Sequence, residues 1–379
     1  MMMAQEIPKF PNRFTLIASD PNPECPASYH LDEIIEGDFK QSSTLHELAS
    51  HSDILSYEIE LASSKVLQEI EASGVKVYPS PKVLEIIQDK YKQSCHFAKL
   101  GLPVPRFFAI ESKQDLLSGI QEIGLPLMIK ARFDSYDGKG NQVLRSLDEI
   151  PQLMENFQDT PIMAQEFIPF DEEISVISAR SRSGNVVCFP VAQNIHGPDY
   201  HILERSIAPA PITKTLSERA LSISSKIVQD FQTEGVLAVE FLVNKGQLFI
   251  NEVAPRVHNT GHYTSEACDY SQFALHLLAG IQEDLPQPEM IVPMAVMQNI
   301  TGPPDFTGEY DILFGEEEVC DLKQIGSLRF HLYNKSLSKP YRKLGHWTLC
   351  SRENQSLEEL LEEADSVLEQ VQIVPKASR

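Results

Sequence analysis

Two short β-type runs joined by a glycine turn limit what this chain can fold into. The runs 237–243 (Leu-Ala-Val-Glu-Phe-Leu-Val) and 247–252 (Gln-Leu-Phe-Ile-Asn-Glu) flank the turn Asn244-Lys245-Gly246, a pattern typical of a β-hairpin. Residues that face each other across a hairpin have numbers with a nearly constant sum. The turn therefore predicts that Glu240 lies opposite Glu252, within about one residue.

Two carboxylates in this arrangement repel each other. With Cβ atoms about 5 Å apart, their charges repel by about 1–3 kcal/mol at effective dielectric constants between 80 and 20. A cation between Glu240 and Glu252 would remove that cost, and Asn251 adds a third oxygen ligand. Such ligands suit Mg²⁺, or Mn²⁺ in its place, carrying the phosphates of a nucleotide. The alternative is two solvated carboxylates on an exposed ribbon, and spacing alone leaves it open.

The hairpin leads into a polar segment, residues 251–264, with an unusual density of unlike chemistry. A carboxylate (Glu252), a guanidinium (Arg256) and an imidazole (His258) follow within eight residues, among a proline and a glycine that suit a fixed, irregular backbone. A purely structural loop seldom combines these groups. The segment is therefore a candidate active-site loop.

Composition and charge exclude several classes of partner. The chain has 379 residues and a net charge of −22, which argues against nucleic acid or an anionic membrane as a partner. Its six cysteines are scattered without a C-x-x-C pair, so neither a disulfide framework nor a zinc site is indicated, and a reducing cytoplasm fits best. No apolar run approaches the length of a membrane span.

The pattern of elements predicts three domains. Residues 1–82 alternate strands and helices, as in a small parallel α/β domain. Residues 83–288 form a larger α+β domain, and residues 289–379 form a small β-rich domain with an acidic terminal helix. The predicted strands are 14–18, 54–58, 75–78, 127–131, 142–144, 162–168, 173–177, 188–191, 193–196, 291–300, 329–333 and 345–349, and the predicted helices are 45–49, 64–73, 83–100, 115–123, 216–231, 270–280 and 357–372.

A glycine-containing turn follows the strand 127–131. Residues 132–141 carry Asp-Gly-Lys-Gly and return into another strand, which indicates a flap rather than a phosphate loop, since no helix follows the glycines. Lys130, just ahead of the flap, is placed to meet phosphate oxygens. An ordinary hairpin is the alternative.

Positive charge is concentrated in one short run. Lys335, Lys339, Arg342 and Lys343 lie within nine residues between two predicted strands. Charge-assisted hydrogen bonds from such a run would hold a phosphate monoester. A solvated basic loop remains the alternative.

Together these motifs resemble the ATP-grasp family. The resemblance is carried by Asn-Glu-Val-Ala-Pro-Arg-Val-His-Asn-Thr-Gly-His (251–262), Ser-Tyr-Asp-Gly-Lys-Gly (135–140), Pro-Phe-Asp-Glu-Glu-Ile-Ser-Val-Ile (169–177), Asn-Ile-His (194–196) and residues 333–346. It covers nearly the whole chain. Within the family the chain is similar to the ligases that carboxylate 5-aminoimidazole ribonucleotide with ATP and bicarbonate, through carboxyphosphate, in purine biosynthesis.

The resemblance implies a role for each matching residue. For ATP it implies phosphate contacts from Lys90 and Lys130, a flap formed by Ser135, Tyr136, Gly138, Lys139, Gly140 and Asn141, an adenine frame of Gln165, Glu166, Phe167 and Ile168, a ribose contact from Glu173 and a further contact from His196. It implies Mg²⁺ on Glu240 and Glu252 with Asn251, bicarbonate on Arg256, His258 and Asn259, and the ribonucleotide on Tyr136, Asp137, Lys335 and Arg342, with Asp137 as the base that takes the amine proton. It also implies a homodimer.

The sequence departs from the family pattern at three places. Lys90 stands where the family usually has Arg, Asp134-Ser135 stand where it usually has two glycines, and the usual opening strand with its glycine-rich turn is not found, the first glycine being Gly37. From the third departure we expect a late-starting form that retains the ATP site but is impaired in ribonucleotide use or solubility. Two alternatives stay open: another ATP-grasp ligase, such as the formate-dependent glycinamide ribonucleotide transformylase, and a catalytically impaired nucleotide-binding remnant.

Overall fold

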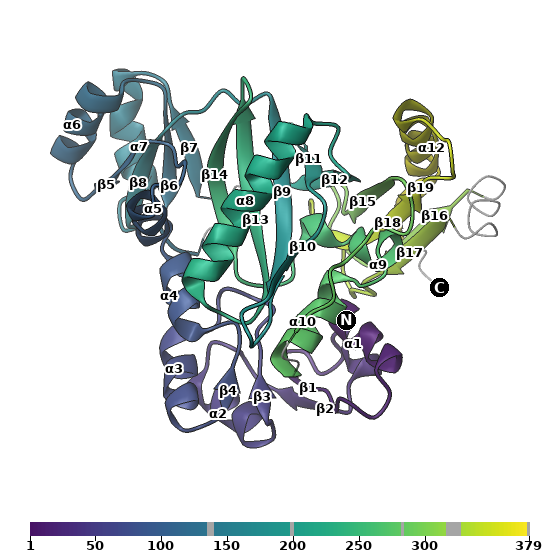
Figure 1. The fold of residues 1–379 in the computed structure, drawn as a ribbon. Coiled ribbons are helices and arrows are strands. Elements are labelled where there is room, and N and C mark those ends of the chain that lie inside the picture. The colour runs from purple at the N-terminus through teal and green to yellow at the C-terminus, as the bar shows by residue number, and fades with distance from the viewer. Residues whose placement is uncertain (135–139, 198–200, 282–283, 316–326, 377–379) are drawn as a thin grey trace.

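The computed structural model describes the chain apart from residues 135–139, 198–200, 282–283, 316–326 and 377–379. Figure 1 shows a large central sheet, with the N-terminal unit below it, a smaller sheet at its upper left and the C-terminal strands at its right. The predicted residues Ser135, Tyr136, Asp137, Gly138 and Lys139 lie outside the described residues.

The N-terminal unit contains two parallel strand pairs, β1 with β2 and β3 with β4. The first of its strands begins three residues later than predicted, and β3 and β4 are only two residues long. Its elements are α1 (Met2–Glu6), β1 (Ile17–Asp20), β2 (Glu33–Glu36), α2 (Ser42–Ser50), β3 (Ile54–Leu55), α3 (Ser64–Ala72) and β4 (Lys76–Val77).

The predicted helix 83–100 is wrong as a single helix. It is divided into α4 (Pro81–Gln88) and α5 (Lys90–Lys99) by Asp89, whose backbone is extended. The Asp89 carboxylate accepts the backbone N–H groups of Tyr91 and Lys92, which makes it the N-cap of α5. Its other partner is the guanidinium of Arg132, with Nε at 3.0 Å from Oδ1. The cap and the ion pair together outweigh helix continuity at this residue.

A four-stranded antiparallel sheet follows, in the order β5-β8-β6-β7. Strand β6 has the predicted bounds, and Lys130 near its end is 7% exposed. The elements are β5 (Phe107–Ile110), α6 (Lys113–Ile123), β6 (Leu127–Ala131), β7 (Asn141–Leu144), α7 (Ile150–Asn156) and β8 (Ile162–Glu166).

The central sheet continues from the middle of the chain into its C-terminal part. Among the described residues its order is β14-β13-β9-β11-β12-β15-β18-β17, with β10 also paired to β9. Its elements in the middle of the chain are β9 (Glu172–Arg180), β10 (Val186–Cys188), β11 (Ala192–His196), β12 (Leu203–Ala208), α8 (Lys214–Phe231), β13 (Gly235–Asn244), β14 (Gln247–Ala254), α9 (Thr264–Ala267) and α10 (Gln272–Ile281). Strand β12 was not predicted, and the predicted strand 188–191 is wrong beyond Cys188, since Pro190 cannot donate a ladder hydrogen bond.

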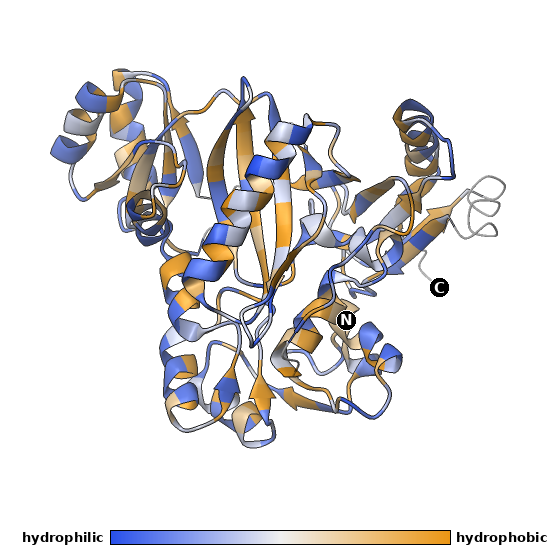
Figure 2. Cartoon of the chain, viewed as in Figure 1, coloured by the Kyte–Doolittle hydropathy of each residue, from blue (hydrophilic) through white to orange (hydrophobic). Residues whose placement is uncertain are grey.

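Helices cover both faces of the central sheet. Helix α8 packs Ala220, Ile227 and Val228 on one face and turns its polar side outward, as Figure 2 shows. Helix α10 is buried nearly all round, because it lies between the other face of the sheet and α1. The central sheet is thereby a rigid support for residues at its strand ends.

The C-terminal elements are β15 (Ala295–Thr301), β16 (Tyr310–Phe314), β17 (Leu328–Leu332), β18 (Lys343–Cys350), α12 (Leu357–Glu369) and β19 (Val371–Pro375). The predicted helix 357–372 is wrong in its last residues. Val371 pairs with Phe314 of β16 and packs against the C-terminal core, so burial of alternating apolar side chains favours a strand there. Across the described ranges, the structure contains no helix with the length and apolarity that a membrane span requires.

Candidate functional site

The predicted pairing of Glu240 with Glu252 is confirmed by the register of β13 and β14. Lys245 and Gly246 form the two-residue turn with φ of 48° and 74°, the conformation that matches the twist of a hairpin. The register shifts next to the pair, since Glu240 faces Glu252 but Phe241 faces Ile250. Asn251 is therefore the extra residue of a β-bulge.

The bulge lets two consecutive side chains each contact a lysine from another element. Nζ of Lys130 donates to Oδ1 of Asn251 at 3.2 Å, and Nζ of Lys90 lies 3.0 Å from Oε1 of Glu252. In a regular strand, neighbouring side chains point to opposite faces. Lys90 begins α5 and Lys130 lies on β6, so three separate elements meet at this point. The two predicted phosphate-binding lysines are thus brought to the predicted metal ligands.

Burial and like charge perturb the acidic groups strongly. Burial, followed by the charges of Glu252 and Glu173, raises the pKa of Glu240 to about 8. Burial also raises the pKa of Glu173 to about 7, although Lys130 opposes the shift. The pKa of Lys130 is lowered to about 8, by burial first and then by the charge of Lys90. Without ligand, the carboxyl groups of Glu240 and Glu173 are therefore less ionised near neutral pH than free glutamates would be.

The donor set fits Mg²⁺. Two carboxylates and one amide lie at neighbouring positions of β13 and β14, and the raised pKa of Glu240 marks a group that a cation would allow to ionise. Within the described ranges, no group of three or more His, Cys, Asp or Glu side chains is arranged to hold a metal ion. Mg²⁺ bound with a nucleotide commonly takes only one or two carboxylates, because phosphates and water complete its shell.

Arg256 is held by a carboxylate from the N-terminal unit. Its Nε lies 3.1 Å from Oε1 of Glu60, and its Nη2 donates to Oε2 at 3.3 Å. Burial opposes the positive charge, yet Glu60 raises the pKa of Arg256 above its ordinary value. Glu60 was not predicted as a site residue. No local signal marks it, since the run Tyr-Glu-Ile-Glu after the short strand β3 fits an exposed segment equally well.

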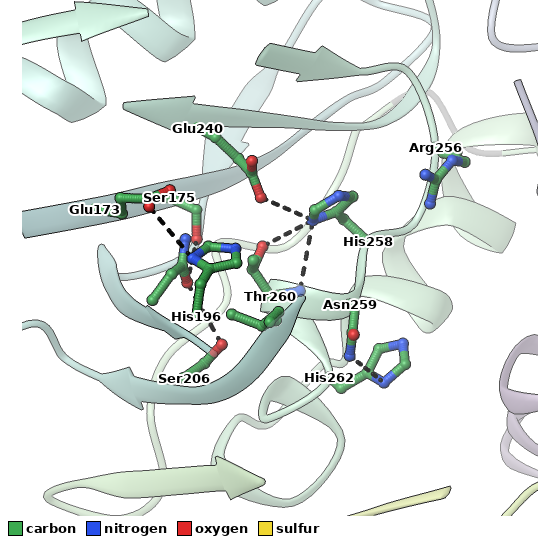
Figure 3. A network of polar contacts seen from close by, with 12 residues as sticks. Glu173, Ser175, His196, Ser206, Glu240, Arg256, His258, Asn259, Thr260 and His262 are labelled. Carbon is green, nitrogen blue, oxygen red and sulfur yellow. Dashed lines mark hydrogen bonds and ion pairs between the residues drawn. The ribbon is translucent and has the colours of Figure 1, made fainter. Parts of the chain in front are cut away.

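His258 lies beside Glu240, one carboxylate of the pair, as Figure 3 shows. Its Nδ1 is 2.9 Å from Oγ1 of Thr260 and 3.8 Å from Oε1 of Glu240. Gln272 fixes its backbone, since the side-chain amide accepts from the His258 N–H at 2.8 Å and donates to its carbonyl at 2.6 Å. Burial, then the charges of Arg256 and Lys343, lower the pKa of His258 well below the ordinary value. A neutral imidazole thus lies near the buried guanidinium.

Asn259 turns its amide toward the protein interior. Its Nδ2 donates to Oδ1 of Asn299 at 3.1 Å, and Asn299 donates back at 2.8 Å. The same Nδ2 lies 3.3 Å from Nδ1 of His262. Both donor hydrogens of Asn259 therefore have internal partners.

The residues predicted for adenine and ribose lie along β8 and β9. Gln165 is 6% exposed and donates to Oγ of Ser94 at 3.3 Å. Glu166 pairs with Arg106 through both oxygens, at 3.0 and 3.1 Å, and Phe167 and Ile168 follow directly after the strand. Glu173 lies 3.4 Å from Nδ1 of His196 on the neighbouring strand β11, within the cluster drawn in Figure 3.

The basic run connects β17 to β18. Nζ of Lys335 lies 5.6 Å from the ring centre of Tyr333, and Arg342 donates to the carbonyl of Leu337 at 2.9 Å. The charge of Lys343 lowers the pKa of both Glu240 and His258, although burial outweighs it at Glu240. Lys343 was in the predicted basic run but not among the predicted site residues, and its end of the run faces the site.

The end of the predicted flap is anchored to β6. The Gly140 carbonyl accepts the N–H of Ala131 at 2.8 Å, and Asn141 pairs with Lys130 in the register of β6 and β7. The remaining flap residues lie outside the described ranges.

The chain matches known protein families along most of its length. Residues 1–88 match the ribonucleotide synthetase preATP-grasp domain, residues 95–273 the ATP-grasp domain, and residues 295–360 the phosphoribosylaminoimidazole carboxylase C-terminal domain. The N5-carboxyaminoimidazole ribonucleotide synthase of Synechococcus elongatus is 34% identical over 360 residues, which span 95% of this chain and 89% of that protein.

Solved structures agree with this match. The crystal structure of the N5-carboxyaminoimidazole ribonucleotide synthetase from Thermotoga maritima superposes with a TM-score of 0.86 at 32% identity, covering 99% of this chain and 96% of that one. The Aspergillus clavatus synthase, in complex with ADP and 5-aminoimidazole ribonucleotide, gives a TM-score of 0.83 at 26% identity and covers 97% and 94%. The predicted fold, an ATP-grasp unit between an N-terminal α/β unit and a C-terminal β-rich unit, is confirmed. On these matches, the chain belongs to the N5-carboxyaminoimidazole ribonucleotide synthase family of ATP-grasp ligases.

Proposed function

We propose that this chain catalyses the ATP-dependent carboxylation of 5-aminoimidazole ribonucleotide in purine biosynthesis, with bicarbonate as the source of the carboxyl group. One observation carries the proposal: the carboxylate pair with its two lysines is directly continuous with the Arg256–His258 segment, and Glu240 lies near both. A phosphate-binding point and an anion-binding point are thereby adjacent. The complex of the Aspergillus clavatus relative with ADP and 5-aminoimidazole ribonucleotide supports the same substrate set.

At the phosphate point, Glu240, Glu252 and Asn251 would hold Mg²⁺. When bound there, the ion would supply positive charge against the phosphate oxygens during phosphoryl transfer. Lys90 and Lys130 would bind phosphate oxygens of ATP from the other side. For this, Nζ of Lys90 would exchange its contact with Glu252 for a phosphate contact.

At the anion point, Arg256 and His258 would bind bicarbonate. Arg256 keeps its charge through its pair with Glu60, and neutral His258 would donate one hydrogen bond. A bicarbonate oxygen would attack the γ-phosphoryl group, releasing ADP and forming carboxyphosphate. Asn259 was also predicted to contact bicarbonate, but its amide hydrogens have internal partners, His262 and Asn299.

The ribonucleotide would approach from the C-terminal side. Lys335 and Arg342 would bind its phosphate, and Tyr136 and Asp137 would close over it, with Asp137 taking the proton of the attacking amine. The amine would then receive the carboxyl group, and inorganic phosphate would leave. Glu173, His196 and residues 165–168 would bind the adenosine of ATP, with Ser135 and residues 138–141 over its phosphates.

The compartment and the oligomeric state of the enzyme are part of the same proposal. We propose that it acts in the cytoplasm as a homodimer. The free state of the five cysteines within the described residues supports a reducing compartment. Light scattering of the purified chain would test the dimer, and a monomer at micromolar concentration would contradict it.

The test of the function is a reaction with one component omitted at a time. Purified chain receives Mg²⁺, ATP, ¹³C-bicarbonate and the ribonucleotide, and ADP release is measured with ¹³C incorporation. We expect both to require the ribonucleotide, and Arg256→Ala to abolish incorporation while Arg219→Ala, an exposed change on α8, leaves it intact. Incorporation of formate in place of bicarbonate would indicate another ligase. Nucleotide binding without ribonucleotide-dependent ADP release would indicate an impaired remnant.

A further inference from the structure

A cluster of aromatic and amide side chains lies behind the candidate site, where the central sheet continues into its C-terminal strands. Asn299, His346 and His331 are paired across β15, β18 and β17, so they form one row across three strands. The rings of His331 and His346 stack at 4.7 Å with an angle of 15°, and His262 lies 4.6 Å from His346. None of these four residues belongs to the proposed catalytic machinery.

Tyr333 joins the row to the segment that carries Arg256 and His258. Its Oη is 2.9 Å from Nδ1 of His346 and 3.4 Å from Nδ1 of His262. His262 in turn contacts the Asn259 amide. A continuous chain of polar contacts therefore runs from β17 and β18 to the anion-binding segment.

The direction of these hydrogen bonds can be worked out from a backbone group. Nδ2 of Asn299 donates to the carbonyl of Leu203 at 2.8 Å, and a carbonyl can only accept. Oδ1 of Asn299 must then accept from Nδ2 of Asn259, which fixes the amide of Asn259. The second hydrogen on that Nδ2 points to Nδ1 of His262, so this nitrogen accepts.

Both donor hydrogens of Asn259 are thus occupied. An anion needs donors, and Asn259 has only a lone pair of Oδ1 to offer it. The contacts favour a role for Asn259 in holding the segment 256–262 rather than in binding bicarbonate.

The cluster stands at both ends of the basic run. Tyr333 precedes Lys335 by two residues, and its backbone N–H donates to the Leu344 carbonyl at 2.9 Å. His346 follows Lys343 by three residues on β18. The contacts that hold Tyr333 and His346 in position therefore also hold the two ends of the segment 335–343.

A purely structural cluster would satisfy its polar atoms more fully. His346 is fully buried, yet its Nε2 has no hydrogen-bond partner among the described residues. Burial lowers the pKa of His346 well below the ordinary value and that of His262 to about 3, so both rings act as neutral hydrogen-bonding groups. Conflict between a side chain and its surroundings is a feature of functional sites.

We propose that Tyr333, His346, His262, Asn299 and Asn259 are positioning residues that lock the ribonucleotide-binding segment 335–343 onto the anion-binding segment 256–262. The lock places the ribonucleotide amine where the activated carboxyl group is formed. It rests on the proposed function, since it assumes a reaction in which two substrates meet at these two segments. Its loss would let carboxyphosphate be hydrolysed before the amine reaches it.

The test is Tyr333→Phe, which removes one hydroxyl and keeps the ring. ADP formation and ribonucleotide consumption are measured together. Loss of a hydrogen bond that contributes about 1 kcal/mol weakens a contact by about fivefold, so KM for the ribonucleotide should rise by about that factor. The ratio of ADP formed to ribonucleotide consumed, about one in the parent, should rise to several, while KM for ATP stays within about twofold.

Tyr263→Phe is the matched control. Tyr263 is buried, whereas Tyr333 is half-buried, and the Tyr263 hydroxyl donates to the Pro190 carbonyl at 2.9 Å, outside the contact chain. It should lower thermal stability without raising the ratio. Asn299→Ala, which frees the Asn259 amide from the other side, serves as a second variant and should raise the ratio as Tyr333→Phe does.

The outcomes separate this inference from the proposed function. A parent chain that consumes no ribonucleotide overturns both. A parent that forms one ADP per ribonucleotide, with Tyr333→Phe and Asn299→Ala doing the same, overturns the lock alone. An equal rise of the ratio in Tyr263→Phe would show general loosening and would also overturn it.

Discussion

Replacing Glu240 by Gln should make the ligand-free protein more stable and its magnesium-nucleotide complex weaker. Glu240 faces Glu252 across the hairpin, and its side chain is 15% exposed. The amide keeps the size of the carboxyl group but cannot ionise. The variant therefore removes the more buried carboxylate of a like-charge pair and, with it, one proposed metal ligand.

The magnitude follows from the pKa of Glu240, which burial and the neighbouring carboxylates raise from 4.5 to about 8. Between these two pH values the folded protein retains a proton that the unfolded chain has lost, so stability falls as pH rises. The slope is at most about 1.4 kcal/mol per pH unit. Over the whole window, the difference in stability between variant and parent should approach about 5 kcal/mol above pH 8, and vanish below about pH 4.5.

Urea unfolding at several pH values between 5 and 9 measures this difference directly. Groups such as His258 and His262, whose lowered pKa also makes stability depend on pH, titrate in both proteins and cancel in the comparison. Glu47→Gln, an exposed change on α2, is the control for loss of one charge. A thermal-shift measurement with Mg²⁺ and ADP completes the assay, since the stabilisation by the ligand should shrink in Glu240→Gln.

Three results would refute the reasoning. A difference in stability that does not grow with pH would mean that Glu240 is ionised in the free protein. A variant less stable than the parent at pH 8 would mean that the carboxylate already has a stabilising partner. An unchanged shift with Mg²⁺ and ADP would remove Glu240 from the metal site.

Three further predictions concern other parts of the molecule. Glu252→Gln should lower the rate of ADP release by at least about tenfold, a loss of about 1.4 kcal/mol of transition-state stabilisation, and an unchanged rate would end its assignment as a metal ligand. Arg342→Ala should weaken apparent ribonucleotide affinity in steady-state kinetics while ATP affinity stays within about twofold; equal weakening of both would point to misfolding. Asp89→Ala should lower the free energy of unfolding by about 3–5 kcal/mol, because it leaves the guanidinium of Arg132 without its partner and removes the cap of α5. Asp89→Asn keeps a cap acceptor and should cost less, so equal losses in urea unfolding would contradict this account.

The sequence was most informative where the physics is local. The turn at Lys245 and Gly246 is enough to set the register that pairs Glu240 with Glu252, because a two-residue turn leaves little freedom. The bulge at Asn251 was not predicted, since nothing in the strand marks which residue is extra.

Interruptions of regular structure were harder to predict. The apolar spacing of α4 and α5 continues through Asp89 closely enough to suggest one helix, and the carboxylate that caps α5 is also needed by Arg132, 43 positions later. The strand β19 has a similar origin, because its pairing with β16 decides against a longer terminal helix. Tertiary contacts outweigh local propensity in both places.

The pairing of cations with carboxylates could not be predicted at all from spacing. Lys90 meets Glu252 from 162 positions away, and Arg256 meets Glu60 from 196 positions away. No periodicity connects such residues. The predicted roles of Lys90 and Arg256 came from the resemblance, and the carboxylate that holds Arg256 was missed because nothing in the local sequence distinguishes Glu60 from an exposed residue.

These pairs resolve a difficulty posed by the chain's charge. A protein with a net charge of −22 must bind anionic substrates, and an isolated buried guanidinium or ammonium would cost several kcal/mol. Arg256 is paired with Glu60, and its Nη1 donates to the backbone carbonyl of Val257 at 3.0 Å. Lys90 is paired with Glu252. Glu60 raises the pKa of Arg256, so this guanidinium remains charged before substrate arrives. Substrate binding at this site would then exchange a carboxylate partner of each cation for a substrate anion. The carboxylates hold the cations in position and reduce their attraction for other anions.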